Sequence, residues 1–398
     1  MSVSDHKMIS TLDLLRINKF VLKKQQLAGG EPNWNIVKTV RAVGGLHATS
    51  AATPYLSLFA RITGFKREHL DHELYVKRTL GKIRYVRTTV YVLPEDMIPA
   101  AFAATRTMSE PASQAYSRLL GVTEQQYREA SKSILEILQG KRGMTTKQIR
   151  KALETSLNVS SIVNLMCDQG LLIRGAPERG WKSNLHTYYL FNDYFPNMKL
   201  NEINEENARL TVIRWHLASF GPVTLDDIAW WTGFPKNQVR HVVESQQDKI
   251  TYINISDSNK TLLMLRQDET SLKLIRKEEK HVINMLPSLD PYMMGYKDRE
   301  RYMNLEHRDY IFDRGGNATS SILLNGKVIG IWDFKEPVIK IFLFEDNATD
   351  LLEDISIKAK SLGAFISGKD IDLRECGSMV PLTQRSAGGV MSPLKDRR

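Results

Sequence analysis

The sequence has 398 residues, 42% of them hydrophobic and 25% charged, which are ordinary proportions for a globular protein of about two to four domains. Its 55 lysines and arginines against 45 aspartates and glutamates give a net charge of +10, which favours a polyanionic partner. The only two cysteines, Cys167 and Cys376, are far apart, which excludes a disulfide framework, a zinc ribbon and a four-cysteine iron–sulfur cluster within one chain.

The first domain, residues 1–120, is predicted to be an N-terminal winged-helix domain that contains His47 and Thr49 and mixes helices with a strand. Apolar spacing predicts helices over residues 12–26, 35–46 and 54–65, with Gly44-Gly45 breaking the second. Residues 83–93 alternate and are rich in β-branched and aromatic side chains, so they predict a strand or one arm of a hairpin.

The second domain, residues 121–200, has the pattern of a winged helix-turn-helix. Thr145 and Gln148 have the spacing of a capping box at the start of a helix. A second helix carries its apolar face from Val159 to Met166 and ends at Gly170. Strands over residues 171–174 and 186–191, joined by a turn-rich tip, complete the unit as a hairpin.

The third domain, residues 201–285, repeats this order of elements. A helix over residues 208–220 precedes a second helix that opens at Thr224 with Asp227 near its positive end. A third helix carries Val239, Val242 and Val243, and strands over residues 250–255 and 261–265 form a hairpin.

The last domain, residues 286–398, is predicted to be strand-rich. Three strands cover residues 320–324, 327–332 and 338–344, and Asn325-Gly326 is a strong hairpin turn signal between the first two. A helix over residues 349–362 follows, and residues 379–398 are predicted to be a loose tail.

Positive charge is concentrated in two windows, residues 61–87 and 141–191, and each contains eight lysines or arginines against three acids. Because lysine and arginine contacts to phosphate supply most of the sequence-independent affinity for DNA, double-stranded DNA is the predicted partner. Arg174, Arg179 and Lys182 fall on the predicted wing of the second domain, where they can follow a phosphate track. The alternative is that these are solvated surface charges.

No apolar run approaches the ~18 residues that a membrane-spanning helix needs, and the N-terminus lacks the layout of a signal peptide. We therefore expect a cytoplasmic monomer that uses neither membrane, metal nor cofactor. His69 and His72 have helical spacing, but the charged residues around them favour a solvated helix face over a metal site.

Five stretches, in this order, resemble the AlkZ-like winged-helix DNA glycosylase family. The family has a Gly-Leu-Gln-x-Gln-type motif, a Tyr-Leu-x-Leu-Trp-x-Arg-type helix, an Arg-Thr/Ser-rich strand, a Leu-Pro-x-Phe-Asp-Pro and Gly-x-x-Asp-Arg stretch, and a terminal barrel strand pair. Here these read Gly45-Leu46-His47-Ala48-Thr49, Tyr55-Leu56-Ser57-Leu58-Phe59-Ala60-Arg61, Arg84 to Leu93, Leu286-Pro287-Ser288-Leu289-Asp290-Pro291 with Gly295-Tyr296-Lys297-Asp298-Arg299, and Ile322 to Trp332.

The resemblance implies an α+β fold of tandem winged helix-turn-helix domains followed by a small C-terminal β-barrel-like domain. It also implies a monofunctional glycosylase that removes N-alkylated, bulky or crosslinked purines from duplex DNA. In the family two glutamines hold the attacking water; here His47 and Thr49 take those positions. Histidine can orient a water and also deprotonate it, with an unperturbed pKa near ~6.5, so both residues are predicted to be catalytic. The alternative for His47 is a capping or packing role.

Further site residues are predicted from their place in these stretches. Tyr55, Arg61, Arg84 and Arg87 are predicted to contact DNA, although packing is the alternative for Tyr55. Asp290, Lys297 and Arg299 are predicted to be structural or to face DNA, with Asp290 and Arg299 as an ion pair.

Two other functions remain open at this point. A non-catalytic DNA-binding protein, such as a regulator or a repair accessory factor, is favoured by the loss of both glutamines. An RNA-binding module is weaker, because the sequence has no RNP-type aromatic motif.

Overall fold

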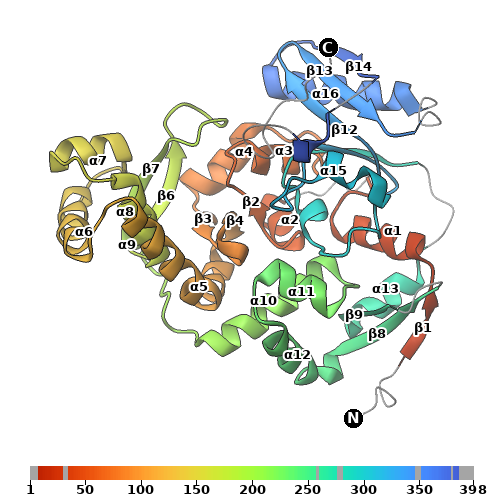
Figure 1. The fold of residues 1–398 in the computed structure, drawn as a ribbon, viewed down its shortest axis with the longest axis horizontal. Coiled ribbons are helices and arrows are strands. Elements are labelled where there is room, and N and C mark those ends of the chain that lie inside the picture. Colours follow the sequence, from red (N-terminus) through yellow and green to blue (C-terminus); the bar gives the residue numbers. More distant parts are fainter. Residues whose placement is uncertain are drawn as a thin grey trace. The chain divides into compact units, whose positions relative to one another are not determined.

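The computed structural model describes residues 8–29, 35–256, 260–275, 281–345, 351–377 and 380–384. They form an α+β protein with two compact units (Figure 1). Unit 1 gathers Met1–Trp34, Leu56–Gly64 and His216–Arg398, and unit 2 gathers Asn35–Tyr55 and Phe65–Trp215. The predicted domain boundaries at residues 120 and 200 fall inside unit 2. Most of the predicted tail lies outside the described residues.

Unit 2 is built on a six-stranded sheet with the order β2-β4-β3-β6-β7-β5. Its strands are β2 (Leu46–His47), β3 (Leu80–Arg84), β4 (Val90–Pro94), β5 (Met144–Thr145), β6 (Leu172–Pro177) and β7 (His186–Leu190). Lys82 of β3 pairs with Arg174 of β6, so strands predicted in two separate domains belong to one sheet. The predicted strand or hairpin arm over residues 83–93 contains a turn, and β3 and β4 are the two arms of the hairpin.

Several helices of unit 2 follow the predicted periodicity, but those over residues 98–119 and 124–138 were not among the predicted elements. They are α2 (Ile36–Ala42), α3 (Thr53–Phe59, shared with unit 1), α4 (Arg67–Asp71), α5 (Ile98–Leu119), α6 (Glu124–Leu138), α7 (Thr146–Leu153), α8 (Val159–Asp168), α9 (Phe191–Tyr194) and most of α10 (Glu205–Phe220). A π-helical turn, His72–Val76, continues α4. The predicted capping box is confirmed, because Thr145 and Gln148 bond reciprocally at the start of α7.

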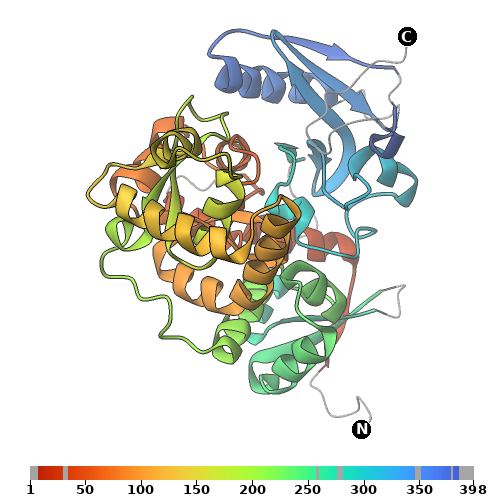
Figure 2. The ribbon, with the colours of Figure 1, turned by 60° about the vertical axis from the view of Figure 1, so that its left-hand side comes forward.

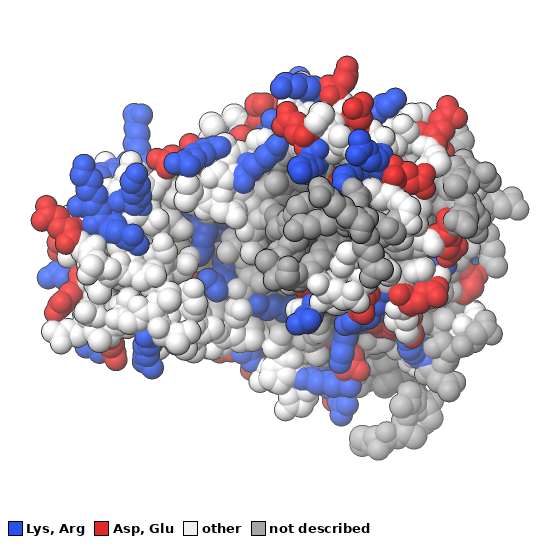
Figure 3. Space-filling model, turned by 45° about the horizontal axis from the view of Figure 1, so that its top comes forward, with Lys and Arg blue, Asp and Glu red and all other residues white. Residues whose placement is uncertain are grey.

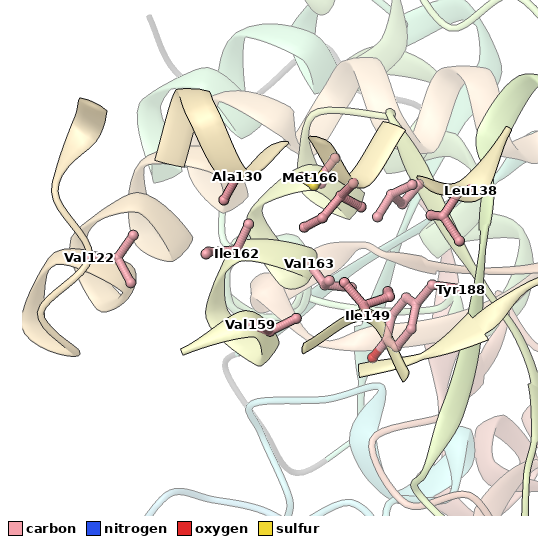
Figure 4. Packing of buried hydrophobic residues seen from close by; sticks show 11 residues of the cluster. Val122, Ala130, Leu138, Ile149, Val159, Ile162, Val163, Met166 and Tyr188 are labelled. Carbon is pink, nitrogen blue, oxygen red and sulfur yellow. The ribbon is translucent and has the colours of Figure 1, made fainter. Parts of the chain in front are cut away.

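A compact apolar cluster holds α6, α7 and α8 against β7 (Figure 4). Ile149 of α7, Ile134 of α6 and Ile162 of α8 are fully buried in it, and Tyr188 of β7 closes one side. Each such side chain contributes roughly 1.5–3 kcal/mol when it is removed from water. The cluster therefore fixes the helix pair on the hairpin in which the predicted wing lies.

Unit 1 contains a three-stranded sheet of β1 (Met8–Leu12), β8 (Ile250–Ile255) and β9 (Thr261–Leu265). The helices that accompany it are α1 (Leu14–Lys24), α11 (Leu225–Thr232), α12 (Lys236–Glu244) and α13 (Glu269–Lys273). The predicted start of α11 is confirmed, since the Thr224 hydroxyl and the Asp227 side chain form a capping box.

The second sheet of unit 1 has the order β10 (Ile283–Leu286), β11 (Ser321–Leu324), β12 (Lys327–Lys335), β13 (Val338–Leu343) and β14 (Asp372–Glu375). Asn325 and Gly326 turn the chain between β11 and β12 with φ values of 51° and 84°, as predicted. The predicted barrel is corrected: β10 and β14 are opposite edges of the sheet, so the described strands are open. Helix α16 (Leu352–Ser367) packs against this sheet (Figure 2).

Two short helices, α14 (Pro291–Met294) and α15 (Arg308–Ile311), lie between β10 and β11 in the chain.

No helix in the described ranges is both long and apolar enough to cross a membrane.

Candidate nucleic-acid site

His47 lies on β2 at one edge of the unit 2 sheet, where it pairs with Tyr91 of β4. The chain reaches this strand through Gly44 and Gly45, whose φ values are 74° and 96°. A Cβ atom on Gly45 would lie 2.5 Å from the Leu93 side chain. Glycine is therefore required both for the backbone conformation and for the close approach of β2 to β4.

The His47 side chain is buried, with 4% of its surface exposed. Its Nε2 atom lies 2.7 Å from the Tyr91 hydroxyl oxygen, and the two rings are 4.2 Å apart between centroids. Its Nδ1 atom is also buried and has no hydrogen-bond partner among the described residues. Nδ1 is therefore the atom of this side chain that can form a further hydrogen bond. A partner there would be favourable, because an unpaired buried polar atom costs roughly 1–3 kcal/mol.

Burial, and secondarily the positive charge of Arg87, lower the pKa of His47 to about 3. The imidazole is therefore neutral near pH 7. This weak basicity does not suit the predicted role of a base that removes a proton from water. It does fit a side chain that orients a water through a hydrogen bond.

The depressed pKa predicts acid sensitivity. The unfolded chain takes up a proton on His47 below pH ~6.5, and the folded chain does not until about pH 3. His47 therefore contributes stability above pH ~6.5 that is lost as the pH falls toward 3. Between pH 7 and pH 5 we expect its share of the loss to be about 2 kcal/mol.

Urea denaturation of the wild type and His47→Gln at both pH values measures this share. His216→Gln in unit 1 is the matched comparison, because burial also lowers the pKa of His216, to about 4. It should reduce the acid sensitivity in the same direction. Equal acid sensitivity of wild type and His47→Gln would contradict a depressed pKa at His47.

Thr49 is exposed in the bend that follows β2. The Ala48 backbone N–H donates to the Val90 carbonyl oxygen at 2.7 Å, so Thr49 follows at the end of the sheet that also carries the turn between β3 and β4. Arg87 and Thr88 in that turn are half-buried. His47, Thr49 and the 85–89 turn thus belong to one corner of unit 2.

The predicted wing, the loop between β6 and β7, carries exposed cations. Arg179 and Lys182 are exposed, and the Lys182 ammonium lies 5.2 Å from the centroid of the Trp181 ring. Trp181 packs edge-on to Tyr55, 5.4 Å between centroids, and the Asn184 side-chain oxygen accepts a hydrogen bond from the Ala51 N–H at 2.9 Å. These contacts bring the loop beside the segment that follows Thr49.

Three predicted DNA contacts are buried instead. The Arg61 side chain is fully buried and forms a bidentate ion pair with Asp290 inside unit 1, with distances of 2.7 and 2.8 Å. Arg174 is buried on β6 and donates to the Asn164 side-chain oxygen at 2.7 Å. Tyr55 is buried, and its hydroxyl donates to Asp71 at 2.5 Å. Partners inside the protein therefore occupy the two arginines that were predicted to contact DNA, and Tyr55 has the packing role that was its alternative.

Arg84 is partly exposed but is also engaged, since its Nε atom lies 2.9 Å from the buried carboxylate of Asp168. The predicted pair of Asp290 with Arg299 is corrected, because Asp290 pairs with Arg61. Arg299 lies over the Phe312 ring at 3.5 Å and donates to the Gly316 carbonyl oxygen at 2.7 Å. Lys297 is exposed in unit 1.

Sequence reasoning missed Tyr91 and Asp168, which fix His47 and Arg84. Tyr91 stood in an alternating strand, where an aromatic residue normally signals only packing. Asp168 offered a usable signal, because an acid beside the apolar face of α8 must find a partner when it is buried.

Figure 3 shows lysines and arginines spread over one face of the molecule with aspartates and glutamates among them. Exposure of individual side chains, rather than the charge of a sequence window, therefore decides which cations can reach a phosphate.

In the described parts of the chain no three His, Cys, Asp or Glu side chains are grouped to hold a metal ion.

If Arg179 and Lys182 contact phosphates, Arg179→Ala and Lys182→Ala should each weaken duplex binding regardless of sequence and flatten its dependence on log salt by about one unit. Fluorescence anisotropy over a salt series measures both quantities. Lys369→Ala, which removes a similarly exposed cation in unit 1, serves as the control. Salt slopes equal to the wild-type slope would remove the wing from the interface.

Comparisons with known proteins agree on one group. A family model described as "DNA glycosylase AlkZ-like" matches residues 40–343. The chain is 22% identical over 319 residues to an interstrand DNA cross-link repair glycosylase of Streptomyces sahachiroi, which covers 76% of this chain and 83% of that protein. The solved structure of Streptomyces sahachiroi DNA glycosylase AlkZ is similar with a TM-score of 0.75 at 19% identity, over 92% of this chain and 100% of that one.

Proposed function

The chain belongs to the AlkZ-like DNA glycosylase family, and from this premise we propose that it binds duplex DNA and hydrolyses the N-glycosidic bond of N-alkylated purines, including bulky and crosslinked ones. The observation that carries the proposal is the buried, neutral His47, whose Nδ1 atom lacks a partner within the described residues, two residues before the exposed Thr49. Both lie in the part of the chain that the family model matches.

The chemistry needs little from the protein. An N7-alkylated purine carries a positive charge, so it leaves with the electron pair of the glycosidic bond and becomes neutral. Water forms the new bond to C1′ through an oxocarbenium-like transition state and loses its proton to solvent. The imidazole tautomer whose Nε2–H donates to the Tyr91 hydroxyl leaves Nδ1 as an acceptor that orients this water, and the Thr49 hydroxyl supplies a second hydrogen bond.

We propose that two segments are winged helix-turn-helix units. In unit 2, α7 and α8 are followed by the β6–β7 hairpin, with β5 pairing on β7. In unit 1, α11 and α12 are followed by the β8–β9 hairpin. Helix pairs of this kind place the second helix in the major groove, and the hairpin of unit 2 presents Arg179 and Lys182 to phosphates.

The test uses duplexes that carry N7-methylguanine, a bulkier N7 adduct or an interstrand crosslink, with undamaged duplex as the control. We expect release of the free modified base, and strand breaks that appear only after alkali treatment because no lyase step follows. No release from any adduct by a protein that binds duplex DNA would refute glycosylase activity.

Duplex binding without release of any modified base would support the second candidate function, a non-catalytic DNA-binding protein. The observation that favours it is the packing of His47 on Tyr91, which suits a structural histidine as well. Affinity that depends on DNA sequence rather than on damage would identify such a protein.

A further inference from the structure

The turn between β3 and β4 holds two adjacent residues in a strained backbone. Arg87 and Thr88 have φ values of 52° and 54°, in the left-handed region that is unfavourable for residues other than glycine, asparagine and aspartate, and above all for β-branched threonine. Such strain costs roughly 1–3 kcal/mol per residue and persists only where the surroundings impose it, which is frequent at functional sites.

Arg84 is one of the groups that impose this turn. Its Nη1 atom donates to the Thr88 carbonyl oxygen at 3.2 Å, while its Nε atom lies 2.9 Å from Oδ1 of Asp168. The Asp168 side chain is fully buried on α8, and its Oδ2 atom accepts a hydrogen bond from the Ser113 hydroxyl at 2.5 Å. A buried carboxylate on one helix thus fixes an arginine, and the arginine fixes the turn.

The turn places a positive charge near His47. Arg87 is close enough for its charge to lower the pKa of the imidazole, and it is half-buried rather than enclosed. The positive charge of Arg87 acts on both this imidazole and the hydroxyl of its Tyr91 partner. A guanidinium in this position suits an oxygen anion such as a DNA phosphate.

We propose that Arg84 and Asp168 are positioning residues, which hold the Arg87–Thr88 turn so that Arg87 binds a phosphate of the damaged strand beside the nucleotide presented to His47. The inference rests on the proposed function and deepens it, because it names the part of the substrate that Arg87 binds. It also explains why a strained turn is retained where Gly or Asn would relax it.

The test compares Arg84→Ala and Asp168→Asn with Ile134→Val, which loosens the apolar cluster of unit 2 away from the turn. We expect each of the first two variants to lower the single-turnover excision rate at saturating protein at least ~10-fold, with the Kd for undamaged duplex changed less than ~3-fold. Melting temperatures of all three variants measure their stability. A loss of excision rate that Ile134→Val also shows is assigned to lower stability.

A second substitution separates positioning from general stability. Asparagine tolerates the left-handed backbone better than threonine. Adding Thr88→Asn to the Arg84→Ala protein should therefore raise its excision rate at least ~3-fold. Excision by Arg84→Ala at the rate of Ile134→Val, or no recovery with Thr88→Asn, would overturn the inference while the proposed function stands. Absence of excision by the wild type would overturn both.

Discussion

Replacing His47 with alanine should lower the single-turnover rate of base excision about 100-fold or more while duplex affinity stays within about 2-fold. The reason is that losing the group that positions the reacting water can cost on the order of 10²-fold, whereas the buried imidazole adds little contact surface for DNA. Rapid-quench measurement of abasic sites, with protein in excess over an N7-methylguanine duplex, gives the rate, and anisotropy gives the affinity.

Two conservative variants test the stated role of the imidazole. His47→Gln keeps an acceptor that can orient a water but cannot take its proton, so it should retain the rate within about 10-fold of wild type. Tyr91→Phe removes the hydroxyl that lies 2.7 Å from Nε2 and should give an intermediate loss of about 10-fold. A His47→Ala protein that is folded and excises at the wild-type rate would exclude His47 from the chemistry.

The second large effect is on stability. Asp290→Asn should lower the free energy of unfolding of unit 1 by about 3–5 kcal/mol, because it leaves the fully buried Arg61 guanidinium without a counter-charge. The same carboxylate accepts from the Tyr292 N–H at the start of α14, and the asparagine oxygen preserves that bond. The loss therefore reports on the ion pair.

Urea denaturation at pH 7 measures this loss, and Asp96→Asn is the matched control. Asp96 also pairs with an arginine, Arg41, at 2.6 Å, but both side chains are well exposed, so its removal should cost about 1 kcal/mol or less. Equal effects of the two substitutions would show that burial of the Arg61–Asp290 pair adds nothing to stability.

Local sequence chemistry predicted the regular elements where a residue pattern fixes them by itself. Thr145 with Gln148 and Thr224 with Asp227 were recognisable as helix starts because the capping atoms lie within one turn. Asn325-Gly326 was recognisable as a turn because both residues accept positive φ. These signals depend on neighbours three or fewer positions away.

The turn at residues 85–89 lacked any such signal. Arg87 and Thr88 adopt a conformation that their side chains disfavour, and the contacts that impose it come from Arg84 and, through it, from Asp168, 80 or so positions along the chain. The union of β3 with β6 in one sheet has the same long-range origin. Periodicity within a window cannot show either.

The resemblance located the candidate site. It did not predict the charge environment of the site. Local charge assigned Arg61 and Arg174 to DNA, but a charged side chain carries no local mark of burial, and each has its partner inside the protein. The lowered pKa of His47 could not be predicted for the same reason, since burial and the nearby Arg87 lower it.

The central claim is that a neutral His47 orients the water in a glycosylase reaction. Single-turnover excision of N7-methylguanine from duplex DNA, measured from pH 5.5 to pH 8, tests it most directly. The account predicts abasic-site formation whose rate constant is unchanged across this range, because the pKa of His47 lies near 3. A rate that falls about tenfold per pH unit below pH ~6.5, or no abasic sites at any pH, would contradict it.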